Sequence, residues 1–197
     1  MLNNNFWQDR YLQNETGWDI GHPSTPLKDY IDQLENKSLN ILIPGCGNSY
    51  EAEYIWQKGF KNIHLLDYAH QPLYNFKKRN PDFPDGNLHC EDFFKHEGSY
   101  DLIIEQTFFC AIDPALRTNY AEHMYALLAD NGKLTGVLFN RDFEKSGPPF
   151  GGSKEEYINY FKPYFDFQVF DTAYNSIEPR AGHELFMILK KRSLPSR

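Results

Sequence analysis

Two glycines and one aspartate have the spacing of a nucleoside-binding site. Gly45 and Gly47 follow the apolar stretch 39–43, which predicts a buried strand, and a helical pattern follows them. Glycine has no Cβ and accepts positive φ, so a turn built on it can approach a ligand closely. Asp67, 20 positions after Gly47, ends the predicted strand 62–67. Its carboxylate is placed to accept hydrogen bonds from the two hydroxyls of a ribose.

The position of the third glycine in the dinucleotide-binding pattern is occupied by Tyr50. A missing glycine argues against a pyrophosphate held over the helix N-terminus and favours a cofactor with adenosine but no phosphates. We therefore expect S-adenosylmethionine (SAM) as the cofactor. Asp67 alone would also allow a nicotinamide-dependent oxidoreductase, and an ordinary tight strand-to-helix turn is a third interpretation of the two glycines.

Aromatic residues are concentrated ahead of the first strand. Trp7 and Tyr11 share one side of a short helix predicted within 6–14, and Trp18 follows it. We expect residues 1–37 to form a lid over the cofactor, since a sulfonium cation gains about 0.5–2 kcal/mol from an aromatic face. The alternative is a flap that only covers the sheet.

Two further predicted strands end in candidate site residues. The stretch 88–94 predicts a strand that ends in an acid and two aromatics, where Asp92 could accept a hydrogen bond from an adenine amine and Phe93 could pack on the ring. A polar strand end with a core phenylalanine explains the same two residues. The predicted strand 100–106 ends at Gln106, which is a site candidate because the carboxyl ends of strands face the ligand crevice in an open α/β sheet.

An apolar pocket for a second substrate is expected beside these residues. Phe108, Phe109 and Phe150 could wall it, and the Gly/Pro-rich loop 140–152 lies where loops often carry substrate contacts. A cation could hold an anion near this pocket, although a solvated or salt-bridged surface position is the more common place for such a residue. The candidate cations are Arg117, Arg141, Arg180 and His183.

The order of the predicted elements indicates the fold. Strands and helices alternate up to a strand at 133–139, and two strands near 166–173 and 184–190 close the chain. This order predicts a mainly parallel, doubly wound sheet in one α/β domain spanning 1–197. A seven-stranded, mostly parallel sheet with one antiparallel strand near the C-terminus is the Rossmann-like arrangement of class I SAM-dependent methyltransferases.

The predicted helix boundaries come from caps and stops. One helix is expected to be capped by Thr25, another to start at Pro72, and a third to run from Asp113 to about Asn131. Ser153 and Glu156 form a predicted capping box.

Composition limits the classes of partner. The net charge of −7 argues against a nucleic-acid partner, and no window approaches the ~18–20 apolar residues of a membrane span. Three cysteines in apolar stretches are typical of reduced, buried thiols in a cytoplasmic protein, and the polar N-terminus does not resemble a signal peptide. We expect a cytoplasmic monomer or weak dimer with a small-molecule acceptor.

Several of these stretches together resemble one family. Trp7, Tyr11 and Trp18 are spaced W-x3-Y-x6-W, which is similar to the W-x3-W-x6-W pattern of the thiopurine S-methyltransferase superfamily. The similarity covers almost the whole chain and is closest to halide/thiocyanate (thiol) methyltransferases of the harmless-to-ozone-layer type. The further matching stretches are 16–19 (TGWD), 43–47 (IPGCG), 65–67 (LLD), 91–94 (EDFF), 108–114 (FFCAIDP) with 116–117 (LR), and 147–150 (GPPF).

The resemblance implies a SAM-dependent methyltransferase and assigns cofactor contacts. Gln106 falls at another cofactor-side position, where the family has Tyr or Arg, and this departure leaves the acceptor open. Tyr11 stands where Trp is usual, and Gly17 where Pro is usual. The implied cofactor contacts are Trp7, Tyr11, Trp18, Gly45, Asp67, Asp92 and Phe93.

The expected reaction is in-line methyl transfer to a small soft nucleophile: a thiol, thiocyanate, hydrosulfide, halide or thiopurine. Such a reaction needs alignment and removal of water but no general base. We name no catalytic acid or base, because no Ser/His/Asp or paired-carboxylate pattern is present. The seven histidines and three cysteines show no metal-ligand spacing, so no metal is expected. A SAM-binding protein without catalysis remains the alternative.

Overall fold

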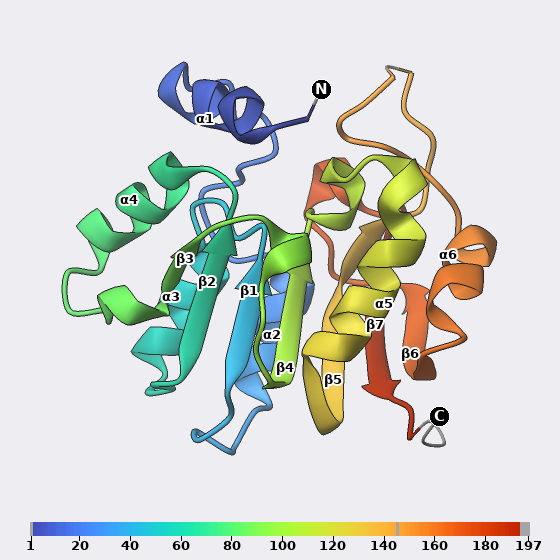
Figure 1. The fold of residues 1–197 in the computed structure, drawn as a ribbon. Coiled ribbons are helices and arrows are strands. Elements are labelled where there is room, and N and C mark those ends of the chain that lie inside the picture. Colours follow the sequence, from blue (N-terminus) through green and yellow to red (C-terminus); the bar gives the residue numbers. More distant parts are fainter. Residues whose placement is uncertain (1, 145, 194–197) are drawn as a thin grey trace.

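The computed structural model describes residues 2–144 and 146–193, which form a seven-stranded sheet between layers of helices (Figure 1). The strand order is β3-β2-β1-β4-β5-β7-β6. Strand β7 is antiparallel to both of its neighbours, whereas the other neighbouring strands run parallel. This arrangement confirms the predicted Rossmann-like α/β fold. The strands are β1 Ile41–Pro44, β2 Ile63–Asp67, β3 Leu88–Cys90, β4 Tyr100–Gln106, β5 Leu128–Phe139, β6 Phe165–Thr172 and β7 Glu184–Lys191.

The helices cover both faces because the strands alternate their buried side chains. Within β1, Leu42 packs into one core and Ile41 and Ile43 into the other. Helices α2, α3 and α4 contribute to the Ile41 side, and α5 and α6 to the Leu42 side. The helices are α1 Asn4–Leu12, α2 Thr25–Asp32, α3 Tyr50–Gln57, α4 His70–Arg79, α5 Arg117–Leu127 and α6 Lys154–Phe161.

Two predicted strand boundaries are wrong for local reasons. Strand β3 ends at Cys90, because Asp92 then caps a short 3₁₀ turn, Phe93–Lys95, by accepting a hydrogen bond from the Phe94 amide at 3.0 Å. Strand β5 begins at Leu128, since this residue already pairs with Tyr100 of β4. The helix expected to reach Asn131 therefore stops at Leu127.

Three predicted helix starts also differ from the structure. Helix α4 begins at His70, and α5 begins only at Arg117, after a 3₁₀ turn that exposes Leu116. Ser24 occupies the N-cap position of α2, while the Thr25 hydroxyl donates to the Asn175 carbonyl.

Only one of the two hydrogen bonds of the predicted capping box of α6 is formed. The Ser153 hydroxyl accepts a hydrogen bond from the Glu156 amide at 3.2 Å, but the Glu156 side chain bonds elsewhere.

The sequence predicted three buried cysteines, and the structure shows that this prediction is wrong. Cys110 is buried and Cys46 half-buried, but Cys90 is exposed next to the end of β3. None of the helices in the described part of the chain is long and apolar enough to span a bilayer.

Candidate cofactor and acceptor site

A cavity of about 990 Å³ opens where the parallel strands end. The residues at the carboxyl ends of β1, β2, β4 and β5 line it, which is where ligands bind in open α/β sheets. Helix α1 lies over this edge of the sheet, at the end opposite to the arrowhead of β7 (Figure 1). The sequence therefore brings the glycine turn, the strand ends and the N-terminal aromatics to one place.

The turn after β1 is shaped for backbone contact. Gly45 and Gly47 both have positive φ, +55° and +53°, where only glycine is unstrained. A Cβ on Gly45 would lie 2.1 Å from Cδ2 of Phe108, and one on Gly47 would lie 2.9 Å from the Tyr11 hydroxyl. No larger residue fits at Gly45 without displacing the Phe108 ring, so this turn presents bare backbone to the cavity.

Asp67 connects this turn to the next one. Its Oδ2 accepts a hydrogen bond from the Gly47 amide at 3.0 Å, and its Oδ1 accepts one from the Ala69 amide at 2.9 Å. Burial raises the pKa of this carboxyl to about 6, against the opposing effect of the backbone hydrogen bonds. Each oxygen keeps a second lone pair for a ligand hydroxyl.

The N-terminal aromatics form one cluster on the cavity. The Trp18 ring packs edge-to-face against Trp7 at 5.7 Å and against Tyr11 at 5.8 Å. All three residues line the cavity, and burial raises the pKa of the Tyr11 hydroxyl. Arg180 holds the segment from the far end of the chain by donating from Nη2 to the Trp18 carbonyl at 2.8 Å.

Asp92, Phe93 and Gln106, which the sequence assigned to the cofactor site, also line the cavity. Phe93 packs edge-to-face on Phe108 at 5.1 Å. The Gln106 Oε1 atom is buried and has no hydrogen-bond partner among the described residues. A buried amide oxygen without a partner is costly, so a donor on a bound molecule is its natural complement.

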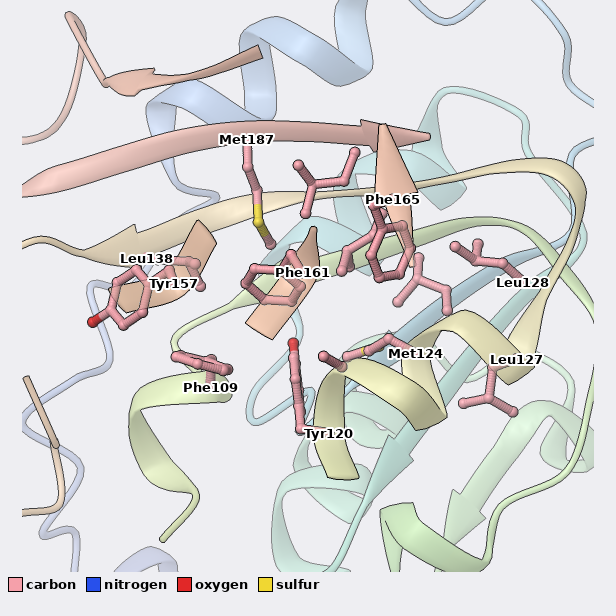
Figure 2. Packing of buried hydrophobic residues seen from close by; sticks show 14 of the residues in the cluster. Phe109, Tyr120, Met124, Leu127, Leu128, Leu138, Tyr157, Phe161, Phe165 and Met187 are labelled. Atoms are coloured by element: carbon pink, nitrogen blue, oxygen red, sulfur yellow. The ribbon is translucent and has the colours of Figure 1, made fainter. Parts of the chain in front are cut away.

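Phe150 lines the cavity, but Phe109 does not. Phe109 is 1% exposed and lies in the aromatic core beside Tyr120 and Phe161 (Figure 2). The expectation of substrate contact at Phe109 is therefore corrected, and its neighbour Phe108 takes the cavity position. Other apolar residues of this wall, which the sequence analysis did not single out, are Ile112, Phe139 and Phe143.

Arg117 is the second corrected substrate candidate. It is 1% exposed and does not line the cavity. Its Nη1 donates to Glu156 at 2.9 Å, its Nη2 donates to the Gly151 carbonyl at 2.8 Å, and its guanidinium lies 4.7 Å from the Phe109 ring centre. Arg117 thus holds the end of the 140–152 loop against α6, and its Nη2 also donates to the Phe150 carbonyl at 3.5 Å.

Of the other candidate cations, Arg141 and Arg180 line the cavity and His183 does not. Arg141 is exposed, whereas the Arg180 guanidinium also donates to Glu184 at 3.3 Å. Asp19 also lines the cavity. It is the last residue of the family-like stretch 16–19 (TGWD), but it was not predicted as a site residue. Its Oδ1 accepts from the Gly21 amide at 2.8 Å.

The carboxylates that line the cavity all have a polar partner in the protein. Asp67 and Asp92 accept from backbone amides, as described, and Glu51 accepts from the Ser24 amide at 2.8 Å. The remaining ones are Glu15 with Arg10, Asp19 with Gly21, Glu91 with His96, and Asp113 with Ala115. Five of these carboxylates accept from backbone amides and therefore hold turns around the cavity, and the other two pair with side chains.

The residues of this cavity fit SAM. The two glycines let Phe108 and Tyr11 lie close against the turn at positions without side chains, Asp67 offers acceptors, and Gln106 has an unpartnered oxygen. The Trp7–Tyr11–Trp18 cluster offers aromatic faces to a sulfonium cation.

Solved structures share this fold. The chain superposes with a TM-score of 0.76 and 15% identity on a 1,6-didemethyltoxoflavin-N1-methyltransferase from Burkholderia thailandensis with bound S-adenosylhomocysteine, covering 96% of this chain and 87% of that one. It superposes with a TM-score of 0.70 and 16% identity on the N-methyltransferase NodS from Bradyrhizobium japonicum in complex with S-adenosylhomocysteine, covering 97% and 100%. The chain therefore has the fold of class I SAM-dependent methyltransferases.

The sequence assigns the family within that class. Residues 2–191 match the model of the thiopurine S-methyltransferase (TPMT) family, and the chain belongs to this family. It is 28% identical over 194 residues to a probable thiol methyltransferase 2 of Arabidopsis thaliana, covering 95% of this chain and 85% of the relative. It is 24% identical over 190 residues to a thiopurine S-methyltransferase of Francisella tularensis subsp. novicida (86% and 84%), and 27% identical over 165 residues to a thiocyanate methyltransferase 1 of Brassica oleracea (80% and 71%).

Proposed function

We propose that this protein methylates small sulfur nucleophiles, with thiols, thiocyanate, hydrosulfide and thiopurines as the acceptor class. The observation that carries this proposal is the composition of the cavity. It combines the glycine turn and Asp67 with aromatic side chains that include Phe108, whose ring lies against Gly45, and Phe150. Relatives named for thiol, thiocyanate and thiopurine methylation support the same class.

Bound SAM supplies a methyl group on a positively charged sulfur. The residues proposed to hold it are Trp7, Tyr11, Trp18, Gly45, Gly47, Asp67, Asp92, Phe93 and Gln106. Asp67 fixes the glycine turn, and Gln106 places one acceptor oxygen inside the cavity. Within the predicted lid 1–37, only the part ahead of α2 acts as a lid in this proposal, because Trp7 and Trp18 line the cavity. Helix α2 packs in the core of the sheet instead.

The protein's part in the methyl transfer is positioning and desolvation. The Phe108–Phe150 wall removes water from a soft anion, which raises its reactivity. A thiol ionises near neutral pH by itself, whereas an alcohol or ammonium acceptor would need a base. Since each cavity carboxylate already has a partner, this site suits an acceptor that arrives as an anion. Arg141 and Arg180 add positive charge to the same cavity.

We further propose that the protein works in the cytoplasm as a monomer or weak dimer and does not bind nucleic acid. The net charge of −7 supports the last point, because phosphate backbones are bound by basic surfaces.

A panel assay with methyl-labelled SAM tests the proposed acceptor class. We expect label transfer to small alkyl and aryl thiols, thiocyanate, hydrosulfide or a thiopurine, and little to a catechol, a carboxylate or a protein lysine. Calorimetry with S-adenosylhomocysteine and with NAD runs beside it as a control for the cofactor. Methylation of a catechol with the whole sulfur panel inert would overturn the proposal, even with SAM binding intact.

A further inference from the structure

A cluster of histidines lies at the β3 edge of the sheet, apart from the aromatic wall. His89 is in β3, Glu91 follows that strand, and His96 follows the 3₁₀ turn Phe93–Lys95. One ligand atom from each of these three side chains lies within 4.8 Å of the others. We propose that His89, Glu91 and His96 bind a borderline divalent cation of the Zn²⁺ class.

The chemistry of the three side chains selects this class of ion. Two imidazoles and one carboxylate are a common protein ligand set for zinc, with the fourth position left to water. Magnesium and calcium prefer sites made of oxygen ligands only. Two ligands of one zinc ion, each bonded at about 2.0–2.1 Å, can be at most about 4.2 Å apart. The cluster must therefore rearrange on binding: its widest separations shorten, while Glu91 Oε1 moves away from His96 Nδ1, now 2.6 Å away. The Glu91 side chain is 45% exposed and has room for this movement.

The surroundings of the cluster resemble the outer shell of a metal site. His96 is 3% exposed, its Nδ1 lies 2.6 Å from Glu91 Oε1, and its Nε2 lies 2.7 Å from the Tyr100 hydroxyl. If Nδ1 binds the cation together with Glu91, Nε2 carries the ring N–H and can donate it to the Tyr100 hydroxyl. Metal-bound histidines usually donate their other ring N–H in this way.

His64 supports the second imidazole. Its Nδ1 lies 3.1 Å from His89 Nε2, and the two rings stack with centres 5.4 Å apart. This contact fixes the His89 ring beside His96, whose ring centre is 4.9 Å away. Of the three proposed ligands only Glu91 lines the cavity, and the imidazoles of His64, His89 and His96 do not.

Equilibrium dialysis of the untagged, chelator-treated full chain against Zn²⁺ tests the site. We expect one bound zinc per chain, an increase in thermal midpoint with added Zn²⁺, and no comparable effect of Mg²⁺. His89→Ala should weaken zinc binding by at least about tenfold and abolish the midpoint shift, because it removes one of three ligands. His89 is only half-buried, so this variant is a safer test than a change at buried His96.

Two matched variants separate the cluster from other zinc-binding groups. His70→Ala removes an exposed histidine on α4, and Cys90→Ser removes the exposed thiol between two of the proposed ligands. Both should bind zinc as the wild type does. No saturable binding in the wild type, equal affinity in His89→Ala, or loss of binding in Cys90→Ser would each overturn the proposal. A cobalt-loaded protein without tetrahedral-type visible absorption would count against it as well.

Discussion

At the scale of single residues, the site depends on buried carboxylates that hold backbone turns. Asp67 joins the turns after β1 and β2, and Glu105 does the same for the turn after β4. Glu105 is fully buried, and its Oε1 accepts from the amides of Phe108 and Phe109 at 2.8 and 3.0 Å. The Tyr120 hydroxyl donates to its other oxygen. The position of Phe108 in the cavity wall therefore follows from Glu105.

Asp67→Asn should weaken binding of S-adenosylhomocysteine by about 10- to 100-fold, which corresponds to about 1–3 kcal/mol. The amide group cannot accept from both Gly47 and Ala69 as well as from ribose hydroxyls. Calorimetry beside thermal unfolding measures the affinity and confirms that the variant is folded. The matched control is Asp166→Asn, an exposed carboxylate on β6. Equal affinity in folded Asp67→Asn and wild type would remove Asp67 from the cofactor site.

Glu105 should make stability fall as pH rises. Burial raises the pKa of its carboxyl from 4.5 to about 7, so between these pH values the folded protein binds more protons than the unfolded chain. The contribution of Glu105 is then fully favourable below about pH 4.5 and declines as pH rises through 7, by up to about 3 kcal/mol.

Urea unfolding of wild type and Glu105→Gln across this pH range measures the effect, because glutamine does not titrate. The free energy of unfolding of wild type relative to Glu105→Gln should decrease as pH rises. Glu122→Gln, an exposed change on α5, should run parallel to wild type. A wild-type to Glu105→Gln difference that stays constant with pH would contradict the argument.

At the scale of elements, the central feature is the N-terminal segment over the ends of β1 and β2. The Gln71 amide at the start of α4 donates to Gln8 of α1 at 2.9 Å, and Arg180 binds the Trp18 carbonyl. These contacts come from distant parts of the chain, so the segment is attached at several points. Its aromatic cluster can then report on the cavity.

Intrinsic fluorescence tests the proposed lid, since the chain has only three tryptophans. Trp7 and Trp18 lie on the cavity, whereas Trp56 packs on Phe83 at 5.1 Å away from it. Adding S-adenosylhomocysteine should change the emission of wild type and of Trp56→Phe to the same extent. Trp18→Phe should lose a large part of the change. A response that disappears in Trp56→Phe would contradict a lid made by the N-terminal segment.

At the scale of the whole molecule, the sequence predicts the sheet well because strand and helix periodicity record burial. The glycine turn and Asp67 were also visible, since their spacing follows from one strand-turn-helix unit. The choice between Phe108 and Phe109 was not visible, because the turn at Thr107 has a positive φ of 57° and changes which ring faces the cavity.

The sequence also did not predict which charged residues are buried. Arg117 carries a charge, which is typical of surface residues. Its partner Glu156 lies 39 positions away in the sequence. The His89–Glu91–His96 cluster spans a strand and a 3₁₀ turn, so no simple helical or strand spacing reveals it. Long-range pairing of polar groups is what sequence periodicity does not record.

The proposed reaction transfers a methyl group to a sulfur anion without a base from the protein. The most direct measurement is kcat/KM against pH for two thiols whose pKa values differ widely. His22 is the only imidazole on the cavity among the described residues, so His22→Ala is measured beside wild type. The midpoint of each profile should follow the pKa of the thiol used, in both proteins. One midpoint shared by both thiols, or one abolished by His22→Ala, would show that a group on the protein takes the proton and would contradict the account.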